Sequence, residues 1–149
     1  MSYPQDLLGV AVELLRVVPE TQATLRRSVS TAYYALFHLI IETACMNWPK
    51  PQRGRVARQF DHKRMKEMSA EAAKKRPGAH AGLTVVATTF VELQQNRHLA
   101  DYDLGIELNP EEVAFDILQV EDAFAIWEAI KDEPAVQDYL FSLLFNPRA

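Results

Sequence analysis

Apolar residues recur at steps of three and four along much of this chain, and this spacing constrains the fold more than any other feature. An α-helix repeats every 3.6 residues, so the spacing places these side chains on one helical face. Five stretches carry it, near residues 7–18, 25–43, 83–93, 113–127 and 139–144. Residues 84–89 are rich in β-branched side chains and could form a strand, but no other stretch offers that strand a partner. The sequence therefore predicts an all-α, up-and-down bundle of about five to six helices.

Prolines and capping residues divide this pattern into separate helices. Pro19 ends the first helix, and Thr21 is a suitable N-cap for the second, which extends to about Asn47. The second helix is apolar around much of its circumference, as expected for a central helix. Asn109 before Pro110 is a strong helix start, because the amide caps the first turn and proline fits its first position. With 149 residues, 48% of them hydrophobic, the chain can bury a core as a single domain over residues 1–149.

Charge is distributed unevenly between a basic segment and an acidic C-terminal third. The basic segment, residues 50–76, holds ten basic and three acidic side chains, a balance of +7. Residues 101–149 hold twelve acidic and two basic side chains, a balance of −10. A basic segment of this kind can bind phosphates, or it can pair with acidic helices of its own chain or of a second copy. The sequence favours these two interpretations equally.

Prolines and glycines bound the basic segment, and apolar positions within it are sparse. We therefore expect one or two exposed, mobile helical pieces between residues 55 and 75, lying over the polar residues described next or extending as an arm. The candidate ligand-binding residues in this segment are Arg53, Arg55, Arg58, Lys63 and Arg64.

A polar line crosses the apolar surface of the second predicted helix. Arg27, Thr31, Tyr34 and His38 are spaced by four, three and four residues, so they share one helical face. The line makes Arg27 a further candidate for ligand binding.

Arg97 should point toward the protein interior, because continuing the apolar stripe of Phe90 and Leu93 by four residues reaches it. A buried guanidinium requires a partner, which Asp101 can supply one helical turn later, and Tyr102 adds a hydroxyl. The simplest interpretation is a satisfied polar cluster that fixes the helix register. The alternative is a site for a small anion or a nucleotide, with Asp101 and Tyr102 among its ligand-binding residues.

Two runs in these helices resemble the HEPN superfamily, in its small-protein branch. They are RSVSTAYYALFH at residues 27–38 and RHLADYD at residues 97–103, and His62 resembles a position often occupied by histidine in that branch. The likeness extends from the second helix to the acidic helix. It implies a helical up-and-down bundle, commonly a homodimer, in a family linked to RNA cleavage, toxin–antitoxin systems and nucleotidyltransferase partners.

In the ribonucleases of this family, the resemblance implies an arginine followed after four to six residues by a histidine, which meet the scissile phosphate as cation and general acid or base. Arg97 matches the arginine. The histidine is absent, because His98 is adjacent to Arg97 and no histidine follows it, while Asp101 and Tyr102 occupy the expected region.

Other side chains could replace the missing histidine. Arg55 and His62 have the required spacing, but this pair does not lie on the helix that carries the family motif. Tyr34, His38 and His62 can supply an acid or base if the fold brings them to Arg97, since imidazole titrates near neutral pH. These three residues and Arg97 are the catalytic candidates.

Several other classes of site and location are disfavoured. The four histidines lack the carboxylate spacing of metal sites, and no glycine-rich loop could hold a phosphate, so we expect neither a metal nor a cofactor. The single cysteine, Cys45, cannot form an intrachain disulfide, and no apolar run approaches the roughly 20 residues that span a bilayer. We expect a cytoplasmic protein outside the membrane.

Three functional interpretations remain. The first is a homodimeric HEPN-type domain that binds RNA, a nucleotide or a separately encoded partner protein, including one in a toxin–antitoxin or defence system. The second is a variant metal-independent ribonuclease in which Arg97 works with a non-standard acid or base. The third is a purely structural protein-interaction module whose polar cluster only stabilises the fold.

Overall fold

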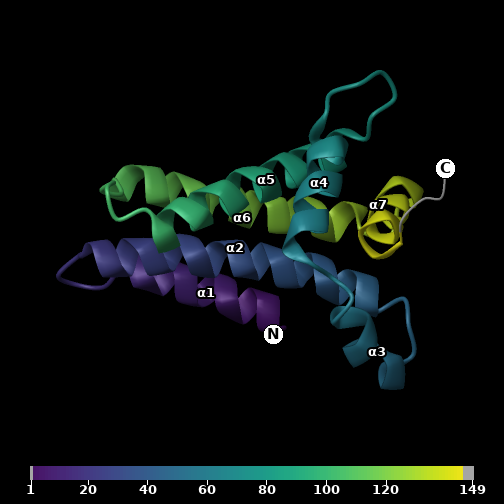
Figure 1. The fold of residues 1–149 in the computed structure, drawn as a ribbon, viewed down its shortest axis with the longest axis horizontal. Coiled ribbons are helices and arrows are strands. Elements are labelled where there is room, and N and C mark those ends of the chain that lie inside the picture. Colours follow the sequence, from purple (N-terminus) through teal and green to yellow (C-terminus); the bar gives the residue numbers. More distant parts are fainter. Residues whose placement is uncertain (1, 146–149) are drawn as a thin grey trace.

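The computed structural model describes residues 2–145, and all regular structure in that range is helical. The seven helices are α1 (Tyr3–Leu15), α2 (Gln22–Cys45), α3 (Lys50–Ala57), α4 (His62–Ala73), α5 (Ala81–Tyr102), α6 (Pro110–Ile130) and α7 (Pro134–Leu144) (Figure 1). The predicted all-α class is confirmed. The described residues form one helix more than the largest number predicted, because the basic segment folds as two helices. Asp61 restarts the helix after α3, accepting a hydrogen bond from the Arg64 amide at 2.8 Å.

Local capping explains where the longer helices begin. Thr21 and Thr24 form a reciprocal capping box at the start of α2, with hydrogen bonds of 3.1 and 3.2 Å. The Asn109 side chain accepts a hydrogen bond from the Glu111 amide at 2.8 Å, and Pro110 occupies the first turn of α6. Both predicted helix starts are therefore confirmed.

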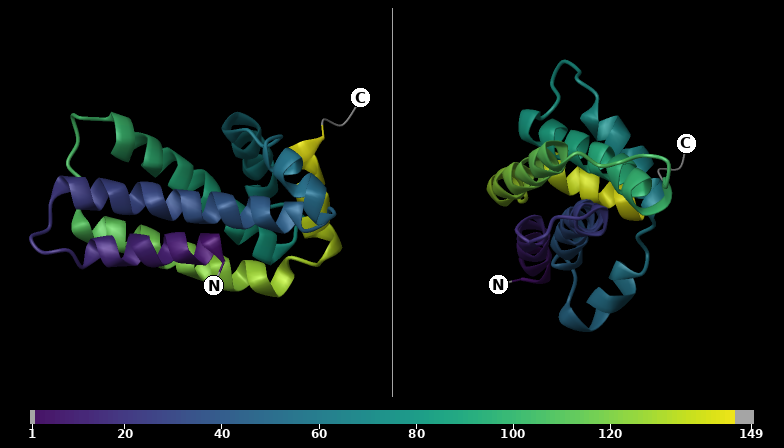
Figure 2. Two further views of the ribbon diagram at one scale, coloured as in Figure 1. Left: turned by 90° about the horizontal axis from the view of Figure 1, so that it is seen from below. Right: turned by 90° about the vertical axis from the view of Figure 1, so that its left-hand side faces the viewer.

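The four longest helices lie alongside one another in two layers. Figure 1 shows α1 and α2 side by side, with α5 and α6 packed over them. Helix α3 follows the C-terminal end of α2 and projects away from the bundle, and α7 packs at the same end. Figure 2 shows this arrangement from two other sides. Helix α2 contacts α1, α3, α5, α6 and α7, which confirms its predicted central position.

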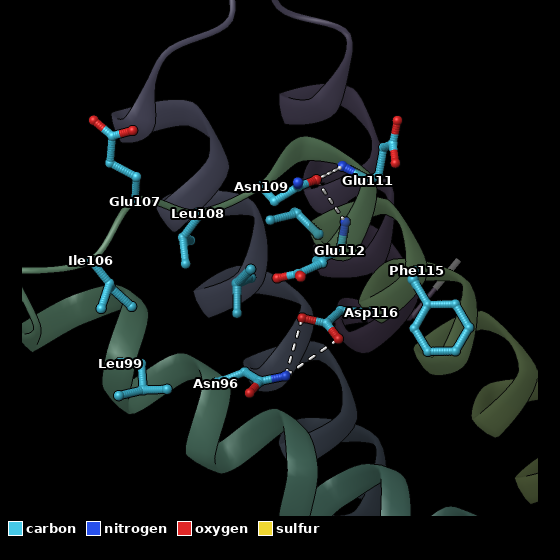
Figure 3. Close-up of a pocket in the computed structure, with 12 residues that line it drawn as sticks. Asn96, Leu99, Ile106, Glu107, Leu108, Asn109, Glu111, Glu112, Phe115 and Asp116 are labelled. Atoms are coloured by element: carbon cyan, nitrogen blue, oxygen red, sulfur yellow. Dashed lines mark hydrogen bonds between the residues drawn. The ribbon is translucent and has the colours of Figure 1, made fainter.

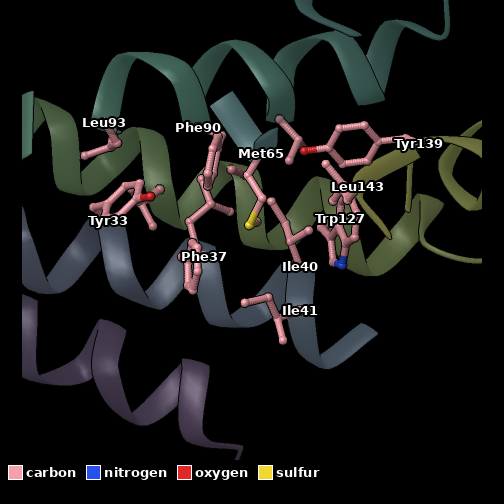
Figure 4. Packing of buried hydrophobic residues seen from close by; sticks show 14 of the residues in the cluster. Tyr33, Phe37, Ile40, Ile41, Met65, Phe90, Leu93, Trp127, Tyr139 and Leu143 are labelled. Carbon is pink, nitrogen blue, oxygen red and sulfur yellow. The ribbon is translucent and has the colours of Figure 1, made fainter. Parts of the chain in front are cut away.

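The core forms where α2, α4, α5, α6 and α7 meet. Tyr33, Met65, Phe90 and Trp127 are completely buried there (Figure 4). The indole nitrogen of Trp127 donates a hydrogen bond to the Thr43 hydroxyl at 2.8 Å, so the largest core side chain has no unsatisfied donor. No helix within the described residues combines the length and apolar character needed to cross a membrane.

Helix α4 packs into the bundle, so the prediction of an exposed basic segment is wrong for this part of it. Met65 is fully buried, and the buried Ser69 hydroxyl lies 2.6 Å from the Tyr139 hydroxyl of α7. The Arg64 guanidinium donates to the carbonyl groups of Ser142 and Phe145 at the end of α7. In contrast, α3 buries none of its residues.

Candidate functional site

The side chain of Arg97 lies against two aromatic rings of α2. Its Cζ atom is 5.1 Å from the ring centroid of Tyr33 and 5.8 Å from that of Tyr34. The side chain is only 12% exposed, which confirms that Arg97 points inward. A guanidinium is attracted to the face of an aromatic ring, and burial strengthens this attraction by excluding water.

The partner predicted for Arg97 is present but distant. The Nη1 atom of Arg97 is 3.7 Å from Oδ2 of Asp101, which is an ion pair but too long for a hydrogen bond. The same carboxylate oxygen accepts a hydrogen bond from the Ser30 hydroxyl at 3.3 Å. The Nε atom of Arg97 is buried and has no hydrogen-bond partner among the described residues. Within the described residues, the hydrogen-bonding capacity of the Arg97 guanidinium is therefore only partly used.

His62, the first residue of α4, joins this arrangement from the basic segment. Its Nδ1 atom is 2.9 Å from the Tyr33 hydroxyl, and its ring stacks on Phe37 at a centroid distance of 4.6 Å. The Gln94 side chain donates to the His62 carbonyl at 3.1 Å and fixes the start of α4 against α5. The structure thus places His62 next to the residues that contact Arg97, although the two residues are 35 positions apart in the sequence.

The protonation state of this pair follows from its surroundings. Burial raises the pKa of the Tyr33 hydroxyl well above its usual range, so the hydroxyl keeps its proton at neutral pH. Burial and the Arg97 charge both lower the pKa of His62, which favours neutral imidazole. The hydroxyl can donate to Nδ1 of His62, or accept from it when the ring proton is on Nδ1, so the tautomer of the neutral ring sets the direction of this hydrogen bond.

His38 occupies the next turn of α2. Its ring contacts Tyr34 at 6.5 Å and Tyr3 of α1 at 5.1 Å between centroids. Burial, and secondarily His62, lower the pKa of His38. Both histidines are therefore neutral at pH 7, and Arg97 is the cation of the group. We refer to Tyr33, Tyr34, His38, His62 and Arg97 as the arginine–histidine cluster.

Comparison with protein-family models, curated proteins and solved structures gives no match. The HEPN resemblance therefore rests on residues 27–38, residues 97–103 and His62.

Other predicted ligand residues lie outside the cluster. Arg27 is exposed on α2, about 10 Å along the helix axis from Tyr34 at 1.5 Å per residue. Tyr102 is 65% exposed and its ring contacts His98 rather than Arg97.

The predicted residues of the basic segment differ in what they contact. Arg53 donates a hydrogen bond to the Trp48 carbonyl at 2.9 Å, and Arg64 donates to the Ser142 carbonyl near the end of α7. Arg55, Arg58 and Lys63 are exposed. Lys74 and Arg76 of the segment form ion pairs with Glu71, which belongs to the same segment.

Sequence reasoning missed Tyr33, which contacts both Arg97 and His62. The resemblance contained Tyr33, but the polar line on α2 passed through its neighbour Tyr34. A signal was present, because Tyr33 lies four residues before Phe37 and so on the same core-facing side of α2. An aromatic hydroxyl at a core position requires a polar partner, which here is His62.

Proposed function

We propose that this chain is a HEPN-type helical domain that binds a phosphate-bearing ligand, RNA or a nucleotide, at the arginine–histidine cluster. The observation that carries the proposal is the state of Arg97, a largely buried cation with a distant carboxylate and an Nε atom lacking a partner among the described residues. A guanidinium presents donors that match phosphate oxygens. The adjacent tyrosine and histidine rings suit a ligand that also carries an aromatic base.

The exposed side chains of the basic segment support this proposal. Arg55, Arg58 and Lys63 are solvent-exposed, and Lys63 follows directly after His62 of the cluster. Cations in this position can neutralise additional phosphates of a polynucleotide. Each such contact releases counterions, so RNA affinity should fall as salt increases from about 50 to 200 mM.

The binding proposal can be tested by fluorescence anisotropy with labelled single-stranded RNA and a labelled nucleotide. Arg97→Gln should weaken binding by at least about tenfold, because a charged hydrogen bond contributes roughly 1.5–3 kcal/mol. Arg16→Gln on α1 is the matched control, since Arg16 is 71% exposed and pairs only with Glu13 among the described residues. Circular dichroism checks that both variants fold. Equal affinities for wild type and Arg97→Gln, without salt dependence, would refute the proposal.

A second candidate function, a variant metal-independent ribonuclease, is favoured by the position of His62. When Nδ1 of His62 carries the ring proton and donates to the Tyr33 oxygen, Nε2 is free to remove a proton from a ribose 2′-hydroxyl while the Arg97 guanidinium stabilises charge on the phosphate. His62→Ala and Arg97→Gln should each abolish cleavage of labelled RNA in the presence of EDTA. RNA that remains intact with the wild-type protein would leave only the binding function.

An apolar stripe on α1 supports the homodimer that the HEPN resemblance implies. Tyr3 and Val10 are 59% and 50% exposed, and Leu7 and Leu14 complete a three- and four-residue spacing like that of a coiled-coil seam. Val17, which follows the end of α1, is 43% exposed. Tyr3 also contacts His38, so a second copy on this stripe would adjoin the cluster. Sedimentation velocity should show a dimer that Val10→Asp dissociates, whereas a monomeric wild type contradicts this assembly. The cytoplasmic location and the toxin–antitoxin setting belong to the same proposal.

A further inference from the structure

A groove separate from the arginine–histidine cluster lies at the end of the bundle where α5 connects to α6 (Figure 3). Its volume is about 510 Å³, which is within the range of ligand-binding sites. Its apolar lining consists of Val29, Leu99, Ile106, Leu108, Val113 and Phe115.

Carboxylates surround this apolar surface. They belong to Glu107, Glu111, Glu112 and Asp116. None of the four makes an ion pair with another described residue. Glu111 and Glu112 lie in the first turn of α6, where the helix dipole alone favours an acid. Asp116 lies more than a turn further along α6, so the helix dipole does not account for a carboxylate at this position.

Asp116 is held in the groove without a compensating positive charge. The Asn96 side-chain amide lies 3.3 and 3.2 Å from its two carboxylate oxygens, as Figure 3 shows. Burial, and to a smaller extent the nearby Glu92 and Glu112, raise the pKa of Asp116 to about 6, although the hydrogen bond from Asn96 lowers it. A cation bound in the groove would favour the ionised carboxylate.

Exposed apolar side chains lie on the two elements that form the groove, at its lining and beyond it. Phe115 and Leu118, three residues apart on α6, are 59% and 58% exposed, and Leu104 in the α5–α6 connection is 89% exposed. This surface extends beyond what one small molecule in the groove would cover, and therefore favours a polypeptide segment.

We propose that this groove docks a basic, apolar-bearing segment of a partner protein. A lysine or arginine head group would lie between Asp116 and Glu112, and apolar side chains of the segment would pack on Leu99 and Phe115. The charge complementarity is clear, because the rim provides four carboxylates and an RNA ligand would be repelled. The inference is therefore independent of phosphate binding at the arginine–histidine cluster.

The arrangement of the chain argues against a second copy as the occupant. Apart from Arg16 and Arg27, the exposed basic residues of the described chain lie on α3, on α4 and in the connection after α4. Figure 1 shows α3 at the opposite end of the molecule from the α5–α6 connection. Pairing these two ends would be head-to-tail, which builds rings or open chains rather than a two-fold dimer.

The docking proposal is tested by calorimetric titration of the full-length protein with a synthetic peptide that presents lysine and leucine at helical spacing. Asp116→Asn and Phe115→Ala should each weaken binding by about thirtyfold, since removing one side of a charged contact in the groove costs about 2 kcal/mol and a packed aromatic contributes similarly. The matched controls are Glu121→Gln, on an exposed position of α6, and Phe141→Ala, whose 61% exposure is close to that of Phe115.

Three results would overturn the proposal. They are no binding of the lysine–leucine peptide, equal binding of a glutamate–leucine peptide, and equal weakening in the control variants. Self-association of the wild type that Asp116→Asn and Phe115→Ala abolish would instead make a second copy the occupant. Circular dichroism of each variant separates loss of the groove from loss of the fold.

Discussion

Replacing Asp116 by asparagine should stabilise the protein at neutral pH. Burial and the neighbouring Glu92 and Glu112 raise the pKa of Asp116 from 3.8 to about 6. An acid with a raised pKa binds its proton more tightly in the folded than in the unfolded chain. The free energy of unfolding therefore decreases as pH rises from about 4 to about 6, and stays lower above that range.

The size of the effect follows from the same shift. A difference of about 2 in pKa corresponds to at most about 3 kcal/mol at neutral pH. Asp116 is only partly buried, so solvent screening reduces the expected gain for Asp116→Asn to about 1 kcal/mol. For a chain of this length, that gain raises Tm by about 2–4 °C.

Thermal unfolding followed by circular dichroism at a series of pH values tests this prediction. At pH 7 the Asp116→Asn variant should have the higher Tm, and the difference should disappear as pH falls toward 4. Asp122→Asn is the control, because Asp122 is exposed on the same helix. The reasoning fails if Asp116→Asn has an equal or lower Tm at pH 7, or if its advantage does not shrink on acidification.

Three further predictions concern contacts that hold the helices together. Phe90→Ala should lower the free energy of unfolding by about 3–5 kcal/mol in urea denaturation, because it leaves a cavity in a fully buried site. Tyr139→Phe should cost about 1–3 kcal/mol in the same measurement, since it removes the hydrogen bond to the buried Ser69 hydroxyl. Arg26→Leu should speed amide hydrogen exchange across residues 99–106, because Arg26 donates to the carbonyls of Ala100, Asp103 and Ile106. Unchanged exchange there would mean that these hydrogen bonds do not hold the end of α5.

Sequence periodicity predicts α2, α5 and α6 well because each of these helices buries a continuous stripe. It predicts α4 poorly for a physical reason. Met65 and Met68 are too sparse to define a stripe, yet one methionine suffices to anchor a short helix that is covered by α5 and α7. The role of Arg64 is likewise invisible in sequence, since its carbonyl partners on α7 lie 78 residues or more away.

The candidate site was predictable only where its geometry depended on a single helix. Arg97 extends a visible stripe on α5, so its inward direction followed from spacing alone. The place of His62 depends on the Asp61 cap, which starts α4 at that residue, and on the packing of α4 against α5. Tyr33 was missed because consecutive helical residues point about 100° apart, and only Tyr34 lies on the polar line. Arg97 nevertheless contacts both rings, since it approaches from another helix.

The C-terminal half of α5 connects the two proposed sites. Asn96 faces the groove and bonds to Asp116, whereas the next residue, Arg97, faces the tyrosine rings of α2. Arg26 fixes this half of α5 to α2 through backbone carbonyls, so the two surfaces keep a constant separation. The arginine–histidine cluster presents the Arg97 cation, and the groove presents carboxylates that no positive charge of the described residues compensates. Ligands of opposite charge therefore do not compete, and a basic partner segment in the groove and a phosphate ligand at the cluster can be bound to the same molecule.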